Sequence, residues 1–177
     1  FFDMPVDNLF TTPLFARFIK KNIKSKNFIC VSPDAGAIER TRALATKINA
    51  DLAIIDKRRP EPGKSKVMNI IGNVKGKDCI IIDDIIDSGG TIINAADALI
   101  KQGAKSVYVF ISHAVLSGDA IKNIQKSKIK KLVITDTIDN SKKIKKTNKI
   151  QVLSIAQLMA EAIKRISNST SVSSLFN

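Results

Sequence analysis

Hydrophobic residues along this chain fall into two kinds of pattern. Short continuous apolar runs, such as Phe28–Val31, Leu52–Ile55 and Cys79–Ile82, have the length of buried strands. Longer stretches repeat apolar residues every three or four positions, which is the spacing of an amphipathic helix. The two patterns predict strands over 28–31, 52–55, 67–71, 77–82, 105–112, 131–135 and 150–153, and helices over 13–24, 37–49, 91–103, 118–126 and 155–166.

The order of these elements predicts the fold class. Strands and helices alternate along most of the chain, which is typical of an α/β protein with three layers, a mostly parallel sheet flanked by helices. Residues 67–82 place two strands in succession, so we expect an antiparallel edge strand there. We find no internal repeat and no dividing linker, and we expect a single domain over residues 1–177 with a tail over 167–177.

The stretch Ile80–Thr91 carries the strongest functional pattern. A buried strand is expected to end at the adjacent aspartates Asp83 and Asp84, a small polar turn over 87–90 follows, and Thr91 opens a helix. Ligands of open α/β sheets lie beyond the carboxyl ends of the strands. A glycine turn and a helix N-terminus attract phosphate, whereas paired carboxylates suit sugar hydroxyls or a divalent cation. The stretch therefore predicts a sugar-phosphate site, with a diol or a metal at the carboxylates.

Further charged residues follow other predicted strands. Asp34 follows the first strand and is able to ligate Mg²⁺ directly or through water. Three cations from Lys57 to Arg59 follow the second, where positive charge suits phosphoryl transfer. Alternation along an extended segment puts Lys57 and Arg59 on one face. His113, the single histidine, follows the fifth strand, where one role for it is that of a general base.

Structural roles stay open for the same residues. Asp83 and Asp84 would then only end a strand, and Ser88 or Thr91 would cap the following helix. Asp34 is equally well a turn residue before a helix. A histidine without a visible partner is usually structural.

Composition narrows the class of protein. The chain is 44% hydrophobic, and its apolar runs are too short to cross a bilayer, which predicts a soluble globular protein. Cys30 and Cys79 lie inside strand-like runs, and we expect buried free thiols in a cytoplasmic protein. The net charge of +13 comes mostly from lysines, which are dense between Lys122 and Lys149. Because no stacking aromatic residues interleave with them, we interpret the lysines as a solvated face that attracts phosphorylated substrates.

Five segments together resemble the ribose-phosphate diphosphokinase (phosphoribosyl pyrophosphate synthetase) family. They are Phe1–Leu9, Ser32–Gly36, Lys57–Arg59, Ile80–Thr91 and Ser171–Phe176. The resemblance implies a phosphoribosyltransferase type I fold and makes the chain the C-terminal half of a two-domain enzyme. It also implies the reaction of the family, which transfers the diphosphoryl group of ATP to O1 of ribose 5-phosphate and yields phosphoribosyl pyrophosphate and AMP.

The resemblance also implies roles for particular residues. Lys57 and Arg59 would be catalytic, and Arg59 would also contact ribose 5-phosphate. Asp34 would anchor Mg²⁺ on the phosphates of ATP. The remaining contacts to ribose 5-phosphate would come from Asp83, Asp84, Asp87, Ser88, Gly89, Gly90 and Thr91.

Assembly and regulation are implied in the same way. Members of the family are hexamers whose subunit contacts build a site for phosphate, as an activator, and for nucleotide, and Asp7, Ser171 and Phe176 match positions implicated there. We expect the apolar end of the tail to dock on a neighbouring subunit. Three other interpretations stay open: a type I phosphoribosyltransferase, a non-catalytic homologue that associates with the synthetase, and a nucleic-acid-binding module based on the lysines. We expect no membrane partner, and nucleic acid only under the last of these.

Overall fold

The computed structural model describes residues 2–25, 27–58, 67–145 and 147–176. Its strands are β1 (Phe28–Ser32), β2 (Asp51–Arg58), β3 (Val67–Ile71), β4 (Asp78–Ile86), β5 (Ser106–Ala114), β6 (Lys131–Thr135) and β7 (Ile150–Leu153). Its helices are α1 (Thr12–Asn22), α2 (Ile38–Ile48), α3 (Gly90–Lys101), α4 (Ala120–Lys126) and α5 (Ala156–Ser167), with 3-10 turns η1 (Ala35–Ala37) and η2 (Ser173–Leu175).

All the strands belong to one seven-stranded sheet in the order β3-β2-β1-β4-β5-β6-β7. β3 pairs with β2 in antiparallel fashion at one edge, and every other neighbouring pair is parallel. The expected mostly parallel sheet with an antiparallel edge strand is therefore confirmed. Because β1 and β4 are neighbours in the middle of the sheet, their carboxyl ends open at the same edge.

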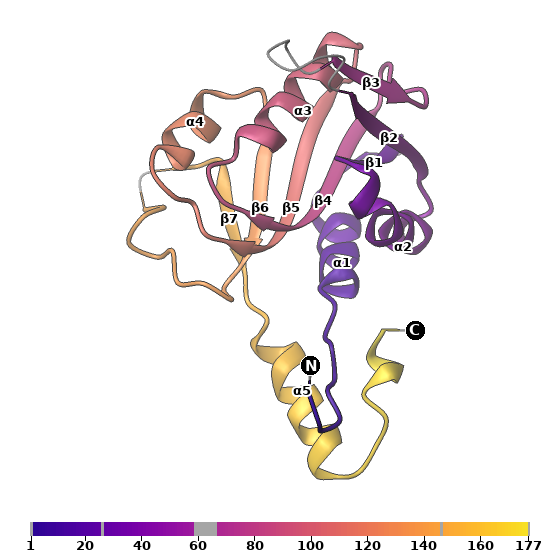
Figure 1. Ribbon diagram of the computed structural model, residues 1–177, viewed down its shortest axis with the longest axis vertical. Helices are drawn as coiled ribbons and strands as arrows, with labels where there is room; N and C mark the ends of the chain where they lie inside the picture. The colour runs from indigo at the N-terminus through magenta and orange to yellow at the C-terminus, as the bar shows by residue number, and fades with distance from the viewer. Residues whose placement is uncertain (1, 26, 59–66, 146, 177) are drawn as a thin grey trace.

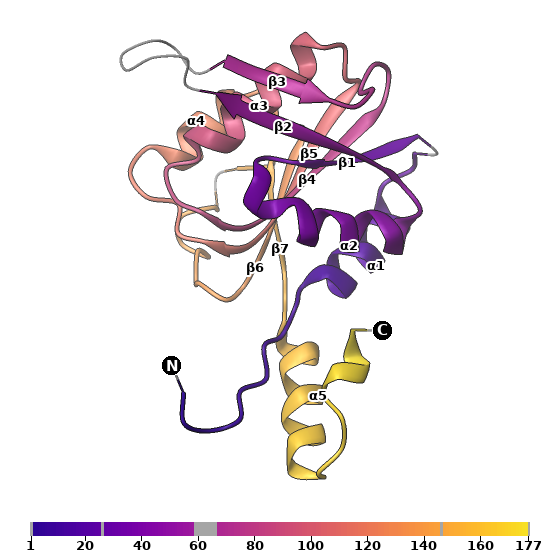
Figure 2. The same ribbon diagram turned by 45° about the vertical axis from the view of Figure 1, so that its right-hand side comes forward.

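Helices cover both faces of the sheet, because β4 is apolar on both sides. Ile80 and Ile82 belong to a buried cluster with Phe15 of α1 and Leu44 of α2. Cys79, Ile81 and their neighbours on that side belong to a second cluster, which includes residues of α3 and α4. Figures 1 and 2 show α1 with α2, and α3 with α4, as two separate groups of helices beside the sheet. This arrangement confirms the three layers that the alternating pattern predicts.

Two central strands run further than the apolar pattern predicts. β4 continues to Ile86 and β5 to Ala114, and the two strands stay paired in parallel up to these residues. Asp83 and Asp84 therefore lie inside β4 rather than after it, and His113 lies inside β5. The prediction was wrong here because it used side-chain polarity, whereas the ladder is made by backbone groups and tolerates polar side chains where the sheet edge meets solvent.

Helix α5 forms as predicted, but its apolar face is mostly uncovered. Only Ala162 of this helix is buried, while Met159, Ile163 and Ile166 are 41%, 61% and 56% exposed. Figures 1 and 2 show the reason, since α5 lies below the sheet, at the same end of the molecule as the N-terminal segment and the C-terminal tail. The helical spacing predicts the helix correctly and does not say whether the rest of the chain covers it.

Both cysteines are free and buried, as expected. Burial raises the pKa of Cys30 and of Cys79 to about 12, so both thiols are protonated at neutral pH. In the described ranges, none of the helices has both the length and the apolar character that crossing a membrane requires.

Candidate functional site

Asp83 and Asp84 share a partner that the sequence did not reveal. Arg40 of α2 places its Nη1 atom 3.1 Å from Asp83 Oδ1 and 2.9 Å from Asp84 Oδ1. Helix α2 follows β1, the neighbour of β4, so its first turn reaches the edge of the sheet where the aspartates lie. One signal was present in the sequence: the helix dipole disfavours a cation in a first turn, so an arginine there indicates an acidic partner.

Each of the two carboxylates also accepts a backbone hydrogen bond. The Asp84 N–H donates to Asp83 Oδ1 over 3.0 Å, and the Ile85 N–H donates to Asp84 Oδ1 over 2.9 Å. Asp83 is the more enclosed, with its side chain 18% exposed against 58% for Asp84. The pair is therefore fixed by both the strand and the helix beside it.

The environments of the two aspartates move their pKa values in opposite directions. Burial, together with the neighbouring Asp84, raises the pKa of Asp83 to about 6. The hydrogen bond from Arg40 lowers the pKa of Asp84 below its usual value. At neutral pH both groups carry charge, but Asp83 takes up a proton in mildly acidic solution.

The turn after β4 leads into α3 without a side-chain cap. Gly89 is the N-cap residue in a left-handed conformation (φ 80°), and α3 begins at Gly90. No side chain hydrogen-bonds to this N-terminus as a cap, so the alternative role of Ser88 or Thr91 as the capping residue is not adopted. Asp87, Ser88, Gly90 and Thr91 are exposed. Since the first N–H groups of a helix have no partner inside the helix, this end of α3 is suited to an anion.

Asp34 follows β1 and has a structural role of its own. Its Oδ1 accepts a hydrogen bond of 3.2 Å from the Ala37 N–H, which caps η1, and its backbone carbonyl accepts one of 2.6 Å from the Ser32 hydroxyl. Within the described ranges, no three acidic, histidine or cysteine side chains gather closely enough to hold a metal ion. A single carboxylate still fits Mg²⁺, which is commonly held by one or two carboxylates together with substrate phosphates and water.

The predicted catalytic cations are not described by the structure. Strand β2 includes the backbone of Lys57, but the side chain of Lys57 and the whole of Arg59 lie outside the described residues. Their roles stay predictions.

A cavity of about 630 Å³ opens beside the acid pair. Its wall combines parts of the chain that are far apart in sequence, including Asn8–Pro13, Gly36, Glu39, Arg40, Ala43, Lys47, Ile82, Asp83, Asp84, Ser112, His113 and Phe176. The volume is within the usual range for small-molecule sites. Residues 87–91 do not line it, so the acid pair faces the cavity and the turn before α3 lies outside it.

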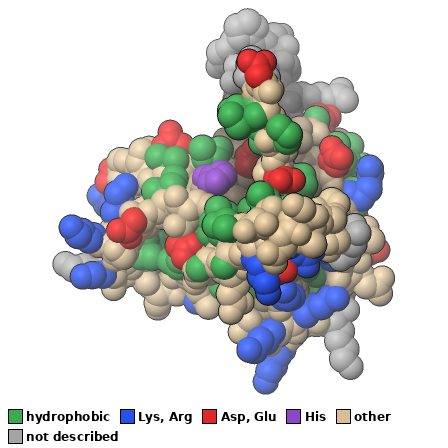
Figure 3. All heavy atoms as spheres, turned by 90° about the horizontal axis from the view of Figure 1, so that it is seen from below, with side chains coloured by type: hydrophobic (Ala, Val, Ile, Leu, Met, Phe, Trp, Pro, Cys, Tyr) green, Lys and Arg blue, Asp and Glu red, His purple; other side chains and the backbone are tan. Residues whose placement is uncertain are grey.

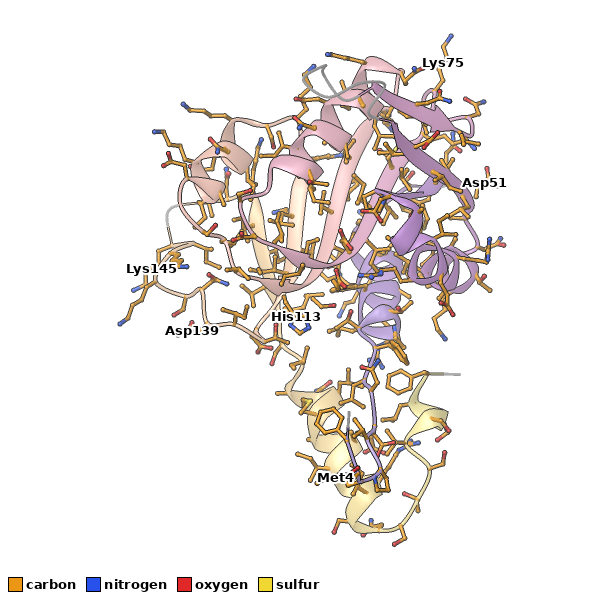
Figure 4. The ribbon with its side chains drawn as sticks, in the orientation of Figure 1. Met4, Asp51, Lys75, His113, Asp139 and Lys145 are labelled. Carbon is orange, nitrogen blue, oxygen red and sulfur yellow. The ribbon has the colours of Figure 1, made fainter. Side chains whose placement is uncertain are left out.

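His113 lies on the wall of this cavity and has a partner. Its Nδ1 is 3.0 Å from the Thr137 hydroxyl, which in turn donates to the Ser112 carbonyl over 2.9 Å. Figure 3 shows the histidine on the lower face among hydrophobic and acidic side chains, and Figure 4 shows it at the lower end of the sheet, toward α5. The threonine contact supports the structural role, while its place on the cavity wall keeps the catalytic role open.

The three candidate regulatory residues differ in their surroundings. Phe176 lines the cavity, and its ring packs edge-to-face on Phe10 with 5.3 Å between the ring centroids. Asp7 and Ser171 are exposed and do not line the cavity. The tail thus packs on its own chain through Phe176, and the regulatory role of the three residues stays a prediction.

Part of the lysine-rich stretch has structural contacts. Lys149 donates to the Ser127 carbonyl over 2.6 Å, and Lys143 donates to the Val115 carbonyl over 3.3 Å. Lys145 points outward in Figure 4. Some of these lysines therefore fasten loops to the body of the protein.

Comparison with known proteins gives consistent matches. A model of the phosphoribosyl synthetase-associated domain matches residues 59–177. Ribose-phosphate pyrophosphokinase of Rhizobium meliloti (strain 1021) is 53% identical over 177 residues, which cover 100% of this chain and 57% of the relative. The same enzyme of Brucella melitensis is 54% identical with the same coverage. The chain thus spans a little over half the length of the curated relatives that it matches.

Solved structures agree with these matches. The crystal structure of phosphoribosylpyrophosphate synthetase from Mycobacterium smegmatis superposes with a TM-score of 0.84 and 32% identity, over 95% of this chain and 54% of that one. A hypoxanthine-guanine phosphoribosyltransferase from Bacillus anthracis superposes with a TM-score of 0.50 and 19% identity, over 58% of this chain and 66% of that one. The second likeness concerns the fold alone, and it confirms the predicted phosphoribosyltransferase-like architecture.

Proposed function

Because the chain belongs to the phosphoribosyl synthetase-associated domain family, we propose that it carries the ribose 5-phosphate site of a ribose-phosphate diphosphokinase. One observation carries the proposal: a fixed acid pair and an uncapped helix N-terminus follow one another along β4 and α3. The identity of 53% to a ribose-phosphate pyrophosphokinase, over the whole of this chain, supports the same assignment.

In this proposal the two ends of the sugar phosphate are bound by different chemistry. Residues 87–91 hold the 5-phosphate through backbone N–H groups and hydroxyls at the start of α3. Asp83 and Asp84 accept hydrogen bonds from the ribose hydroxyls, since ionised carboxylates are acceptors only. Binding at both ends fixes the direction of the sugar and therefore the position of its O1.

In the proposed reaction, O1 of ribose 5-phosphate is the attacking atom. O1 attacks the β-phosphorus of ATP, the O1–P bond forms, and the bond from the β-phosphorus to the oxygen shared with the α-phosphorus breaks, so that AMP leaves and the O1 proton is lost. Asp34 would supply one ligand to Mg²⁺, which offsets charge on the ATP phosphates. Lys57 and Arg59 would stabilise charge on the transferred group. Positioning and electrostatics account for most of the catalysis in such transfers.

Assembly and location are part of the same proposal. A homohexamer with phosphate as an activator follows from the family, and a cytoplasmic location fits the free thiols of Cys30 and Cys79. Light scattering after size exclusion, with and without phosphate, measures the mass of the assembly. A mass that stays at one subunit for the full-length protein would contradict the hexamer.

Calorimetric titration of ribose 5-phosphate into the chain, with Mg²⁺ present, tests the site. Saturable binding at one site is the expected result, and no binding to a folded chain would contradict the proposal. An assay of AMP formation from ATP and ribose 5-phosphate with the full-length protein then tests the activity. Consumption of phosphoribosyl pyrophosphate with a nucleobase would instead indicate a transferase, and binding without turnover would indicate a non-catalytic homologue.

A double variant tests the two cations. In the full-length enzyme, Lys57→Ala with Arg59→Ala should lower turnover far more than the affinity for ribose 5-phosphate. A loss confined to affinity would give these residues a binding role instead.

A further inference from the structure

Arg40 occupies an unusual electrostatic position. Its guanidinium contacts both carboxylates of the acid pair through the single atom Nη1. The hydrogen bond to Asp84 raises the pKa of Arg40, and the charges of Asp83 and Asp34 add to this shift. Its side chain is 34% exposed and lines the cavity beside the pair. Among the described side chains, Arg40 is therefore a positive charge close to three aspartates at the edge of the sheet.

The geometry of β4 alone does not explain why Asp83 and Asp84 contact the same atom of Arg40. Successive side chains of a β-strand point to opposite faces of the sheet, so adjacent aspartates do not converge on one ligand by default. Here Asp83 Oδ1 and Asp84 Oδ1 both lie within 3.1 Å of the same nitrogen. Arg40 is the described side chain that joins them into a pair.

The same contact bears on which ligand the pair accepts. A divalent cation bound by these carboxylates would lie within a few ångströms of the guanidinium, and the two positive charges would repel. A sugar hydroxyl carries no net charge and needs only a carboxylate lone pair. The Oδ1 atom of each aspartate already accepts from Arg40 and from a backbone N–H, which leaves the Oδ2 atom of each aspartate for a hydroxyl. The arrangement therefore favours a diol over a metal ion.

We propose that Arg40 is a positioning residue that holds Asp83 and Asp84 together for the hydroxyls of a vicinal diol and keeps divalent cations off the pair. In identifying the diol with that of ribose 5-phosphate, the inference rests on the proposed function. It chooses the diol from the two kinds of ligand that the sequence left open for these carboxylates.

Three single variants test this role. Arg40→Gln removes the charge and keeps a polar side chain, whereas Arg40→Lys keeps the charge and loses the planar guanidinium. Arg42→Gln is the matched control, because Arg42 is exposed on the same helix and does not line the cavity. Circular dichroism and thermal melting establish that each variant is folded.

The binding of two ligands, ribose 5-phosphate and Mn²⁺, is measured in separate experiments. Binding of ribose 5-phosphate is followed by calorimetry in the absence of divalent cations, and binding of Mn²⁺ alone is followed by electron paramagnetic resonance. We expect Arg40→Gln to bind ribose 5-phosphate about tenfold more weakly and Mn²⁺ about tenfold more tightly than the wild type does. A tenfold change is the scale of one charge-assisted hydrogen-bond network. Arg40→Lys should exclude Mn²⁺ as the wild type does while restoring only part of the sugar affinity, and Arg42→Gln should match the wild type.

Adding Asp84→Asn to Arg40→Gln should abolish the gain in Mn²⁺ affinity, because the new metal site then lacks a carboxylate. Unchanged Mn²⁺ binding in Arg40→Gln would overturn the proposal. If that variant also lost sugar affinity, Arg40 would be a direct ligand of the sugar phosphate instead. If even the wild type failed to bind ribose 5-phosphate, the proposed function would fail, and the Mn²⁺ comparison would still decide whether Arg40 excludes cations.

Discussion

Lys47 of α2 donates a hydrogen bond of 2.8 Å to the backbone carbonyl of Phe176, so the last turn of the chain is fastened to the helix that carries Arg40. Phe176 also packs its ring on Phe10. The two contacts close one side of the cavity with segments from opposite ends of the chain.

Phe176→Ala should loosen the N-terminal segment without unfolding the sheet. An edge-to-face aromatic pair contributes about 0.5–1.5 kcal/mol beyond its buried area, so amide exchange over residues 8–14 should speed up by roughly two- to tenfold. Hydrogen-exchange mass spectrometry measures it, with Ser173→Ala as an exposed control. Unchanged exchange over 8–14 would show that the ring contact does not hold the segment.

Asp83→Asn should weaken ribose 5-phosphate binding at least about tenfold, because an amide oxygen is a poorer acceptor than a carboxylate and the contact with Arg40 loses its charge. Calorimetry on the folded variant is the measurement. Asp119→Asn, at an exposed position before α4, should bind as the wild type does. Near-normal affinity in Asp83→Asn would remove this residue from the sugar site.

Substitutions at Gly89 and Gly90 should have different effects, the first on folding stability and the second on ligand binding. Gly89 has a φ of 80°, so Gly89→Ala should cost about 1 kcal/mol of folding free energy, measured by urea unfolding. A Cβ on Gly90 meets no atom within 4 Å, so Gly90→Val should fold normally and lose sugar-phosphate binding because the side chain takes the space of the anion. Normal binding by Gly90→Val would place the phosphate elsewhere.

Asp83 should make folding stability depend on pH. Its pKa is about 6 in the folded chain against 3.8 for the free side chain, so between these values the folded state keeps a proton that the unfolded state releases. Protons then favour folding, and the contribution of Asp83 is full below pH 4 and is lost as the pH rises to about 6. The stability of the wild type relative to Asp83→Asn, from urea unfolding at several pH values, should fall over this window. A difference that stays flat would contradict the raised pKa.

The sequence located the strands well, and it predicted their ends well only where backbone pairing stops close to the end of the apolar run. Strands 131–135 and 150–153 were predicted with the bounds that the structure has, because each strand ends within one residue of its last apolar residue, Ile134 in the first and Leu153 in the second. The strand predicted over 77–82 continues to Ile86, since backbone pairing with β5 outlasts the apolar run. Side-chain patterns therefore locate strands well and their exposed ends poorly.

The candidate site was predictable in part for a related reason. The acid pair and the glycine turn are close in sequence, and local order was enough to place them one after the other along β4 and the start of α3. Arg40 is 43 positions from Asp83, and only the adjacency of β1 and β4 brings them into contact. Lys57 and Arg59 remain predictions, as does the regulatory role of Asp7, Ser171 and Phe176.

The continuation of β4 through Asp83 and Asp84 separates the site into a fixed part and a replaceable part. In the proposed site, the hydroxyl acceptors Asp83 and Asp84 belong to the sheet, whereas residues 87–91 form the turn that follows it and the first two residues of α3. In this proposal, insertions or exchanges within residues 87–91 would alter what is recognised at the phosphate end of the sugar and leave the recognition of the ring hydroxyls in place. A protein built this way is able to acquire a new sugar derivative as its ligand by changing five consecutive residues.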